Sequence, residues 1–269
     1  MPELPEVEVT RRGIAPHLTG QTISAVAVRN PRLRWRISHS VASLAGRTVR
    51  GVRRRGKYLL VDCGDGHLII HLGMSGSLRL LAPGTPPQKH DHFDLVLGDR
   101  LLRMRDPRRF GAVLWTAGRV EAHPLIRHLG LEPLSRSLDA RRLHRLTRAC
   151  RTSIKQLLMD GRRIVGVGNI YASESLYRAG IDPRTRADRL SLERCDRLAR
   201  AIKQTLQAAI RAGGSSLRDF VSAQGELGCF QQRYRVYDRA GESCRRCGAP
   251  VKRIVQGQRS TFYCSRCQT

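Results

Sequence analysis

The first six residues, Met1-Pro2-Glu3-Leu4-Pro5-Glu6, place a potential nucleophile beside two carboxyl groups. A small second residue favours removal of the initiator methionine, and we expect this to leave Pro2 with a free secondary amine. The reference pKa of an α-amino group is roughly 8, so part of such an amine is uncharged at neutral pH. An uncharged amine attacks electrophilic carbon to form a Schiff base, and Glu3 and Glu6 would transfer protons beside it. The same residues also suit the acidic first turn of an ordinary helix.

The charge of the chain indicates a polyanionic partner. The 269 residues include 49 basic and 22 acidic side chains, giving a net charge of +27, and 41% are hydrophobic. This balance is typical of a folded protein that binds nucleic acid. An acidic membrane surface is the rival partner. However, the sequence has no apolar run long enough to span a bilayer and no evident secretory leader. We therefore expect a nucleic-acid partner, no membrane association and a cytoplasmic protein.

Lysine is rare among the basic residues, which makes its positions informative. Lys57 directly follows three arginines in the run Arg53-Arg54-Arg55-Gly56-Lys57. Arginine replaces lysine where only charge is needed, but it does not replace a lysine that must exchange a proton. We interpret Lys57 as a functional residue, and the alternative is a solvated lysine at the end of a strand.

Four cysteines have the spacing of a zinc site, with one C-x-x-C pair followed sixteen residues later by a second. These are Cys244, Cys247, Cys264 and Cys267. Two such pairs converge on a tetrahedral metal, and four thiolates leave no open position for water. We therefore expect one structural Zn²⁺ and no catalytic metal. A disulfide is the weaker alternative in a reducing cytosol. The other cysteines, Cys63, Cys150, Cys195 and Cys229, have the scattered positions of small hydrophobic residues.

The segment between the two cysteine pairs predicts a β-hairpin over residues 251–263 with its tip at 256–258. The zinc would then aim this hairpin, and Arg259 with it, at a partner. Further upstream, the glycine-rich run 161–174 leads into a helix beginning near Asn169. Backbone N–H groups at such a helix start hold phosphates, although the same pattern is often only a turn.

Two further segments predict exposed wedge residues. Two cations stand beside an aromatic residue in Asp106–Gly111, and Met74 lies among glycines in His71–Gly76. A protein that extrudes a base from duplex DNA must fill the gap, and Met74, Arg108 and Phe110 suit that task. The alternative for Met74 and Phe110 is packing in a core.

These residues need a scaffold, and the sequence predicts an α+β fold. A helix at 5–18 precedes β-rich runs at 22–28, 48–53, 58–62, 68–72, 77–81, 93–97, 101–104 and 112–116. Their spacing predicts an antiparallel sandwich or barrel. Helical periodicity follows at 139–150, 152–159, 169–179, 191–212 and 215–223. We predict three domains: a helix and β-sandwich at 1–132, a helical domain at 133–233 and a zinc finger at 234–269.

Together these motifs resemble the bacterial formamidopyrimidine-DNA glycosylase family across essentially the whole chain. The resemblance rests on Met1–Glu6, Gly56–Tyr58, His71–Leu78, Lys89–His92, Asp106–Gly111, Gly166–Ser175 and the zinc knuckles with Gln258–Tyr263. It implies a β-sandwich domain, a helix–two-turn–helix DNA-binding motif and a zinc-finger hairpin. It also implies a monomer in base-excision repair that removes 8-oxoguanine and formamidopyrimidines from damaged double-stranded DNA and cleaves the strand by β,δ-elimination.

The resemblance also implies a role for each candidate residue. Pro2 would attack the sugar, Glu3 would act as general acid and Glu6 would support the site. Lys57 would serve β-elimination, and Arg259 would serve δ-elimination and contact a phosphate. Met74, Arg108 and Phe110 would fill the gap, with Arg108 reading the orphaned cytosine. The expected phosphate contacts are His71, His90, Lys155 and Asn169, and a loop near 215–228 would close over the flipped base.

The sequence departs from the family pattern at two positions, and two alternative functions stay open. Cys229 stands where the family pattern has an aromatic residue, which bears on the lesion loop, and Arg218 replaces a common lysine. The nearest rival function is excision of oxidised pyrimidines, as in the endonuclease VIII branch, although Leu4 and the Pro107–Gly111 wedge favour the purine branch. A non-enzymatic, zinc-dependent DNA-binding protein is the rival from another class, but it gives no reason for the Pro2–Glu3 pair.

Overall fold

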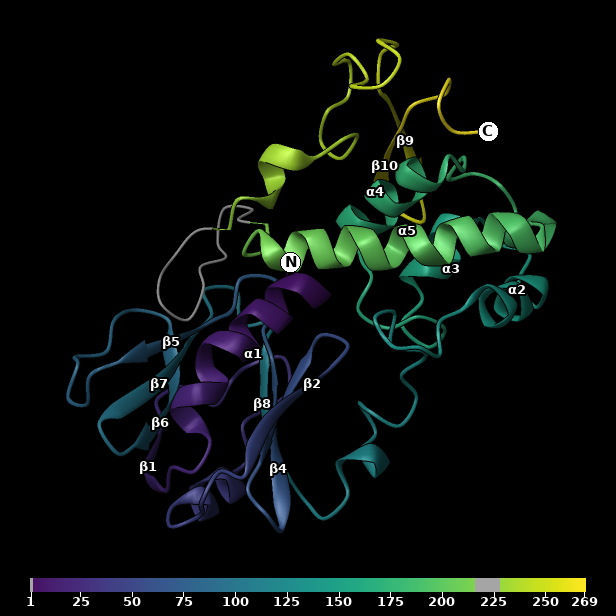
Figure 1. Ribbon diagram of the computed structural model, residues 1–269. Coiled ribbons are helices and arrows are strands. Elements are labelled where there is room, and N and C mark those ends of the chain that lie inside the picture. Colours follow the sequence, from purple (N-terminus) through teal and green to yellow (C-terminus); the bar gives the residue numbers. More distant parts are fainter. Residues whose placement is uncertain (1, 216–227) are drawn as a thin grey trace. The chain divides into compact units, whose positions relative to one another are not determined.

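The computed structural model describes residues 2–215 and 228–269, which form two compact units (Figure 1). Unit 1 comprises the residues up to Arg127 together with Ala212–Cys229. Unit 2 comprises His128–Arg211 and Phe230–Thr269. The division into domains 1–132, 133–233 and 234–269 stays a prediction.

Two four-stranded antiparallel sheets form the body of unit 1. Their strands are β1 (Ile23–Val28), β2 (Gly51–Arg55), β3 (Tyr58–Asp62), β4 (Gly66–His71), β5 (Ser77–Leu81), β6 (Asp91–Leu97), β7 (Arg100–Arg105) and β8 (Ala112–Ala117). One sheet has the order β1-β6-β7-β5, and the other has the order β2-β3-β4-β8. Two 3-10 helices, η1 (His39–Leu44) and η2 (Val120–Ala122), lie outside the sheets.

One buried core joins both sheets of unit 1 to helix α1 (Leu4–Leu18). Leu59 and Val61 reach this core from β3, and Phe93 and Leu95 reach it from β6. In each pair the two residues are two positions apart, so both side chains point to the same face of their sheet. Val7, Ile14 and Leu18 of α1 belong to the same core, and burying such a side chain typically contributes about 1.5–3 kcal/mol.

A charged cluster fixes α1 against the edge strand β2. Glu8 accepts hydrogen bonds from Arg11 Nη2 and Arg12 Nε, both at 2.9 Å, and from Arg54 Nε at 3.2 Å. Arg11 also donates to the carbonyl of Val52 at 3.4 Å. Burial alone raises the pKa of Glu8, but the hydrogen bonds from Arg11 and Arg12 and the charges of Arg11 and Arg54 lower it to about 2.

We expect Glu8→Gln to lower the free energy of unfolding at pH 7 by about 1–2 kcal/mol, after allowance for solvent screening. The pKa of Glu8 is lower in the folded chain than in the unfolded chain. The stabilisation is therefore complete above pH 4.5, the ordinary value, and is lost as the pH falls through about 2. Urea denaturation of both proteins between about pH 7 and about pH 3 checks this, and the difference should narrow with acidification. Glu193→Gln, at an exposed pair with Arg197, is the control and should change stability by less than about 0.5 kcal/mol.

Helices dominate unit 2. They are α2 (Ala140–Arg148), α3 (Ile154–Met159), α4 (Asn169–Ala179) and α5 (Leu192–Arg211), with 3-10 turns η3 (Ala187–Arg189) and η4 (Phe230–Arg233). The long helix α5 buries Cys195, Leu198, Ile202 and Leu206, whose spacing of three or four residues places them on one face. Helix α4 ends at Gly180, whose left-handed φ of 68° suits glycine.

A short hairpin completes unit 2 and confirms the prediction for 251–263. It consists of β9 (Lys252–Gln256) and β10 (Arg259–Tyr263). Gly257 and Gln258 form its tip with φ values of 53° and 62°. Positive φ at both central residues is typical of the tight turn that matches strand twist.

The predicted α+β fold is confirmed, with small shifts in element bounds. The largest shift concerns β2, predicted at 48–53 but observed at Gly51–Arg55. Thr48 instead forms an isolated bridge with Thr22, and β2 continues to the turn at Gly56. Arg218 lies outside the described residues. So does the predicted helix at 215–223, apart from Ser215. Within residues 2–215 and 228–269, no helix is both long and apolar enough to cross a membrane.

Candidate active site and nucleic-acid interface

The chain start is held by a network of hydrogen bonds around Glu6. Glu3 and Glu6 are 3% and 2% exposed, at the beginning of α1. Glu6 accepts from the backbone N–H of Glu3 through Oε2 and from the backbone N–H of Ser215 through Oε1, both at 2.8 Å. Pro2 is buried directly before this pair. One carboxylate therefore orients the terminal residues and ties them to the segment that begins at Ala212.

Strand register brings other candidates to one end of the β2-β3-β4-β8 sheet. Tyr58 pairs with His71, and His71 pairs with Ala112. Lys57 precedes Tyr58 in the β2–β3 turn, the Met74 segment follows His71, and Phe110 precedes Ala112. The Glu8–Arg54 contact brings the early turns of α1 to the end of β2 beside this turn. Residues far apart in sequence are thus gathered at one edge of unit 1.

His71 is poised as a neutral hydrogen-bond donor. Its Nδ1 accepts the backbone N–H of Gly73 at 3.0 Å, so this nitrogen carries no proton and Nε2 carries one. Burial, with the charges of Lys57 and Arg34, lowers the pKa of His71 to about 4. The ring therefore stays uncharged across physiological pH and offers Nε2–H to an acceptor such as a phosphate oxygen.

Asp106 organises the two loops that carry the predicted wedge residues. This fully buried carboxylate accepts from Ser75 Oγ at 2.7 Å through Oδ1 and from Gly111 N–H at 2.7 Å through Oδ2. Ser75 Oγ in turn accepts the N–H of Arg108 at 3.2 Å. The loop after β4 and the loop before β8 are therefore fastened together by one side chain.

The wedge residues themselves are exposed, which excludes the core-packing alternative. Met74 is 38% exposed and Phe110 is 42% exposed. The guanidinium of Arg108 lies over the Phe110 ring, 5.0 Å from its centroid, in a cation–π contact. Because hydrogen bonds fix these loops, their exposed apolar side chains are suited to inserting into a binding partner.

Gly73 permits the close approach of these loops, and we expect Gly73→Ala to disrupt it. Its φ is +62°, and a Cβ there would lie 2.4 Å from the carbonyl carbon of Phe110. The substitution should cost about 3 kcal/mol of unfolding free energy from backbone strain and overpacking together. Gly84→Ala is the control, because Gly84 has φ +80° but nothing within 4 Å, so strain alone should cost about 1 kcal/mol. Chemical denaturation compares the two, and equal losses would contradict the tight loop contact.

The candidates of unit 2 are joined by a buried lysine. Lys155, on α3 and 1% exposed, donates from Nζ to Asn169 Oδ1 at 2.6 Å, Thr261 Oγ1 at 2.6 Å and Ser260 O at 3.1 Å. Asn169 Nδ2 also donates to Ser260 O at 3.0 Å. Lys155 thus fastens the start of α4 to strand β10, beside the exposed Arg259. Its burial gives it a bracing role, and direct phosphate contact by Lys155 stays a prediction.

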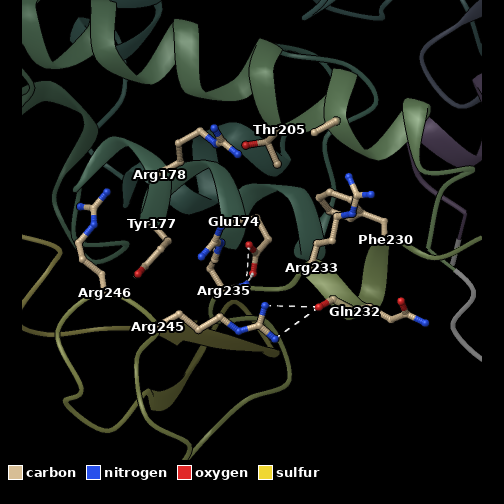
Figure 2. A pocket seen from close by; sticks show the side chains of 11 residues that line it. Glu174, Tyr177, Arg178, Thr205, Phe230, Gln232, Arg233, Arg235, Arg245 and Arg246 are labelled. Atoms are coloured by element: carbon tan, nitrogen blue, oxygen red, sulfur yellow. Dashed lines mark hydrogen bonds between the residues drawn. The ribbon is translucent and has the colours of Figure 1, made fainter.

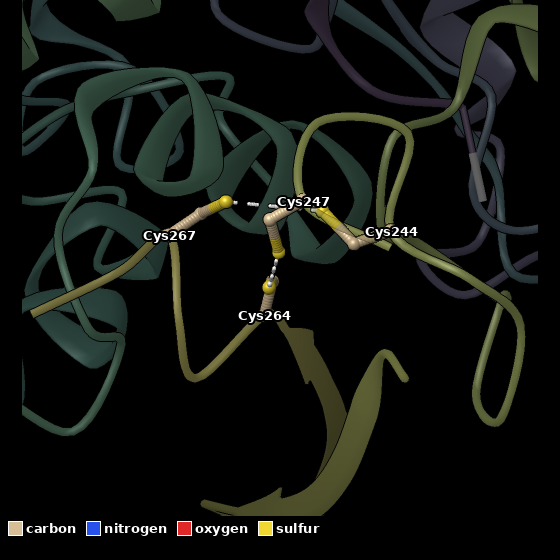
Figure 3. A group of neighbouring side chains, drawn as sticks. All are labelled: Cys244, Cys247, Cys264 and Cys267. Atoms are coloured by element: carbon tan, nitrogen blue, oxygen red, sulfur yellow. Dashed lines mark hydrogen bonds between the residues drawn. The ribbon is translucent and has the colours of Figure 1, made fainter. Parts of the chain in front are cut away.

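The four clustered cysteines fit a tetrahedral zinc ion (Figure 3). Their Sγ atoms all lie within 4.8 Å of one another, with Cys244–Cys267 at 3.9 Å and Cys247–Cys264 at 3.5 Å. Zn–S bonds of about 2.3 Å in a tetrahedron require sulfurs about 3.8 Å apart. Tyr177 Oη lies 3.2 Å from Cys244 Sγ and would stabilise a thiolate there by donating its proton.

The structure brings the predicted residues together within each unit. Two acidic residues that hold these parts of the fold in place, Asp106 and Glu174, were not singled out from the sequence. Asp106 braces the wedge loops, and its only sequence signal is a lone acid in a basic segment. Glu174 accepts backbone N–H groups of Arg235, Val236 and Tyr237, which no motif indicates. Cys229, grouped with the small hydrophobic residues, is instead exposed, and its backbone N–H donates to the carbonyl of Ala212 at 3.0 Å.

Two further predictions concern His90 and the lesion loop at 215–228. His90 is half-buried with a left-handed φ of 76°, and its carbonyl accepts the N–H of Asp106, so this loop also adjoins the wedge. Most of the predicted lesion loop at 215–228 lies outside the described residues. Within them, Ser215 forms an isolated bridge with Cys229.

Three family models match the sequence. They are the formamidopyrimidine-DNA glycosylase N-terminal domain over residues 1–113, the formamidopyrimidine-DNA glycosylase H2TH domain over 129–221, and the zinc finger found in FPG and IleRS over 241–269. The zinc-finger match agrees with the geometry of the thiolate cluster, so the four cysteines form a structural zinc site. Curated formamidopyrimidine-DNA glycosylases of Herminiimonas arsenicoxydans and Methylococcus capsulatus are 58% and 55% identical, with 100% of both chains covered.

Solved structures show the same likeness. The MutM (FPG) protein from Thermus thermophilus superposes with a TM-score of 0.88 at 40% identity, covering 99% of this chain and 98% of that one. Lactococcus lactis Fpg in complex with DNA containing an abasic site gives a TM-score of 0.91 at 35% identity, covering 99% of both chains. The sequence identities, full-length coverage and matching folds establish that the chain belongs to the formamidopyrimidine-DNA glycosylase family.

Proposed function

We propose that this protein excises oxidised purines, such as 8-oxoguanine and formamidopyrimidines, from double-stranded DNA and then cleaves the strand by β,δ-elimination. As a member of its family it is a DNA-repair glycosylase with AP lyase activity, and its partner is DNA. The single observation that carries the residue assignment is the fixed, buried arrangement of Glu3 and Glu6 behind Pro2.

Pro2 is the proposed nucleophile. After removal of Met1 its nitrogen bonds to C1′ of the damaged nucleotide as the bond from C1′ to the base breaks. The base leaves with the bonding electrons, and the proton lost by the amine neutralises it. Glu3 gives a proton to the sugar ring oxygen as the ring opens, which leaves a cationic iminium on Pro2. Glu6 acts through position, because both of its oxygens hold backbone N–H groups that set the terminus.

Strand cleavage follows from the acidity that the iminium creates. The cation withdraws electrons from C2′, so loss of a C2′ proton expels the 3′ phosphate. Lys57 serves this first elimination. Arg259 serves the second, in which the 5′ phosphate leaves, and its permanent charge suits a departing phosphate. Its exposure on β10 and the Lys155 brace beneath that strand support this assignment.

The remaining candidates hold the duplex open. Met74, Arg108 and Phe110 occupy the gap left by the everted base, and Arg108 reads the orphaned cytosine through its guanidinium donors. His71, as a neutral Nε2–H donor, binds a backbone phosphate. His90 and Asn169 contribute further phosphate contacts. We assign Lys155 the orienting of Asn169, alongside the phosphate contact predicted from sequence.

The protein acts as a monomer in the cytoplasm, where bacterial DNA lies. One chain carries every residue assigned to the reaction, so the chemistry needs no second copy. Light scattering of the purified protein should give a mass near 30.2 kDa. Twice that mass at micromolar concentration would contradict the monomer.

Paired substrates test the proposed lesion class. Identical duplexes carrying 8-oxoguanine opposite cytosine or thymine glycol opposite adenine are incubated with the enzyme under single-turnover conditions. Faster excision of 8-oxoguanine supports the purine assignment. Faster excision of thymine glycol would show that oxidised pyrimidines are the preferred lesions, and it would contradict the proposed substrate class.

A further inference from the structure

Unit 2 contains a pocket of about 570 Å³ to which no step of the proposed reaction has been assigned. It lies between α4, the second half of α5, η4, the chain leading into the first zinc knuckle and that knuckle itself (Figure 2). Its volume falls within the range of about 300–1,000 Å³ typical of small-molecule sites. Its lining carries five arginines: Arg178, Arg233, Arg235, Arg245 and Arg246.

These arginines are exposed and have no carboxylate partner. Within the described residues, none of the five guanidinium groups lies within 4.0 Å of an acidic oxygen, unlike Arg184 and Arg197, which pair with nearby acids. The side chain of Arg178 donates to an amide oxygen, that of Gln204, at 3.5 Å. Guanidinium groups gathered without counter-charges repel one another, and an anion between them removes that repulsion.

A buried hydroxyl group gives an independent sign of a missing ligand. Thr205, on α5, lines the pocket and is 2% exposed. Its Oγ1 has no hydrogen-bond partner in the described structure. An unsatisfied buried polar group is costly, and native proteins rarely keep one without a reason. An acceptor oxygen entering the pocket would satisfy this hydroxyl.

The pocket also contains one acid, Glu174, which is occupied by the fold. Its oxygens accept the backbone N–H groups of Arg235, Val236 and Tyr237 at 2.9–3.1 Å. Burial raises the pKa of Glu174 despite these hydrogen bonds. Five arginines therefore face a single carboxylate whose oxygens are already engaged, and the pocket keeps an excess of positive charge.

We propose that this pocket is a second anion-binding site that takes phosphate groups, with a pyrophosphate unit as its minimal ligand. Guanidinium forks match phosphate oxygens in bidentate geometry, and Thr205 Oγ1 donates to a further phosphate oxygen from α5. The phosphates come from one of two sources: a stretch of DNA backbone beyond the lesion, or a free nucleoside di- or triphosphate. The proposal does not depend on the assignment of the excision residues.

Calorimetric titration of the zinc-loaded protein with inorganic pyrophosphate tests the site. The titration is run once on the DNA-free protein and once on protein saturated with a short duplex that carries an abasic-site analogue. Arg178→Gln combined with Arg233→Gln should weaken pyrophosphate binding by about tenfold or more. Arg141→Gln combined with Arg197→Gln removes the same charge from exposed helical positions and should leave this binding unchanged. Zinc content is measured after each titration to exclude metal stripping.

Thr205→Val provides a variant that should fold at least as well as the parent, because it removes the unpaired hydroxyl. It should keep the thermal midpoint of the free protein while reducing the stabilisation that pyrophosphate gives.

The two sources give different results. Pyrophosphate binding to the duplex-saturated protein, lost in the arginine variant, indicates a free ligand. Pyrophosphate binding to the DNA-free protein alone indicates that the site holds DNA backbone. In that case the arginine variant should lose more affinity for a longer duplex than for a short one. Unchanged pyrophosphate binding in both the arginine variant and Thr205→Val overturns the site.

Discussion

Two extra residues ahead of Pro2 should abolish base excision and strand cleavage while leaving duplex binding intact. The extension converts the secondary amine into an amide, whose nitrogen is not nucleophilic. Loss of a catalytic nucleophile lowers the rate by roughly 10³-fold or more. The basic surface, wedge loops and zinc finger are unaltered, so affinity for a lesion duplex should stay within about threefold, as expected for a change outside the phosphate contacts. Gel-based excision and anisotropy binding assays measure the two effects separately.

A removable extension supplies the control. A protease that cuts directly before Pro2 should restore activity to the same preparation, which rules out misfolding as the cause. Full activity with the extension still attached would show that another group performs the attack. Equal inactivity before and after removal, with normal binding, would favour a non-enzymatic DNA-binding protein.

Removing the zinc should have the second-largest effect. The finger has a small apolar cluster that includes Val236, Val251 and Phe262 together with two of the cysteines. A segment this short rarely folds without a metal, and structural zinc supplies about 10–16 kcal/mol of binding free energy. We expect Cys247→Ser to lose zinc, expose the segment beyond residue 234 to protease and weaken duplex binding by at least about tenfold as Arg259 loses its support.

Cys229→Ser is the matched control for zinc loss. Cys229 is an exposed cysteine outside the metal cluster, so this variant should keep one zinc ion per chain and normal protease resistance. Atomic absorption and limited proteolysis measure both properties. Retention of zinc by Cys247→Ser, or unchanged duplex binding after zinc loss, would contradict the structural role given to the metal.

Local sequence patterns predicted much of this protein because its chemistry uses distinctive residue types. The C-x-x-C pairs determine the zinc site by spacing alone, and the Gly257–Gln258 tip follows from the turn that a tight hairpin requires. The spacing of the short β-rich runs located the strands, because turn residues separate one strand from the next. The sandwich was therefore expected before the pairing of individual strands was known.

Long-range polar contacts escaped prediction for a physical reason. Asp106 is buried because Ser75, thirty-one positions away, and Gly111 donate to it, and no local pattern encodes such partners. Lys155 was predicted to contact a phosphate, but in the fold it donates to Asn169 and to two consecutive residues of β10. The exposure of Cys229 likewise could not be read from its residue type, because cysteine is most often buried.

Borohydride trapping on a duplex with 8-oxoguanine opposite cytosine, followed by peptide mass mapping, tests the central claim most directly. Borohydride reduces the iminium to a stable amine, so the covalent adduct identifies the attacking nitrogen. We expect a single adduct on Pro2 in a chain that lacks Met1. An adduct on Lys57, or no adduct from active zinc-loaded protein, would contradict the account.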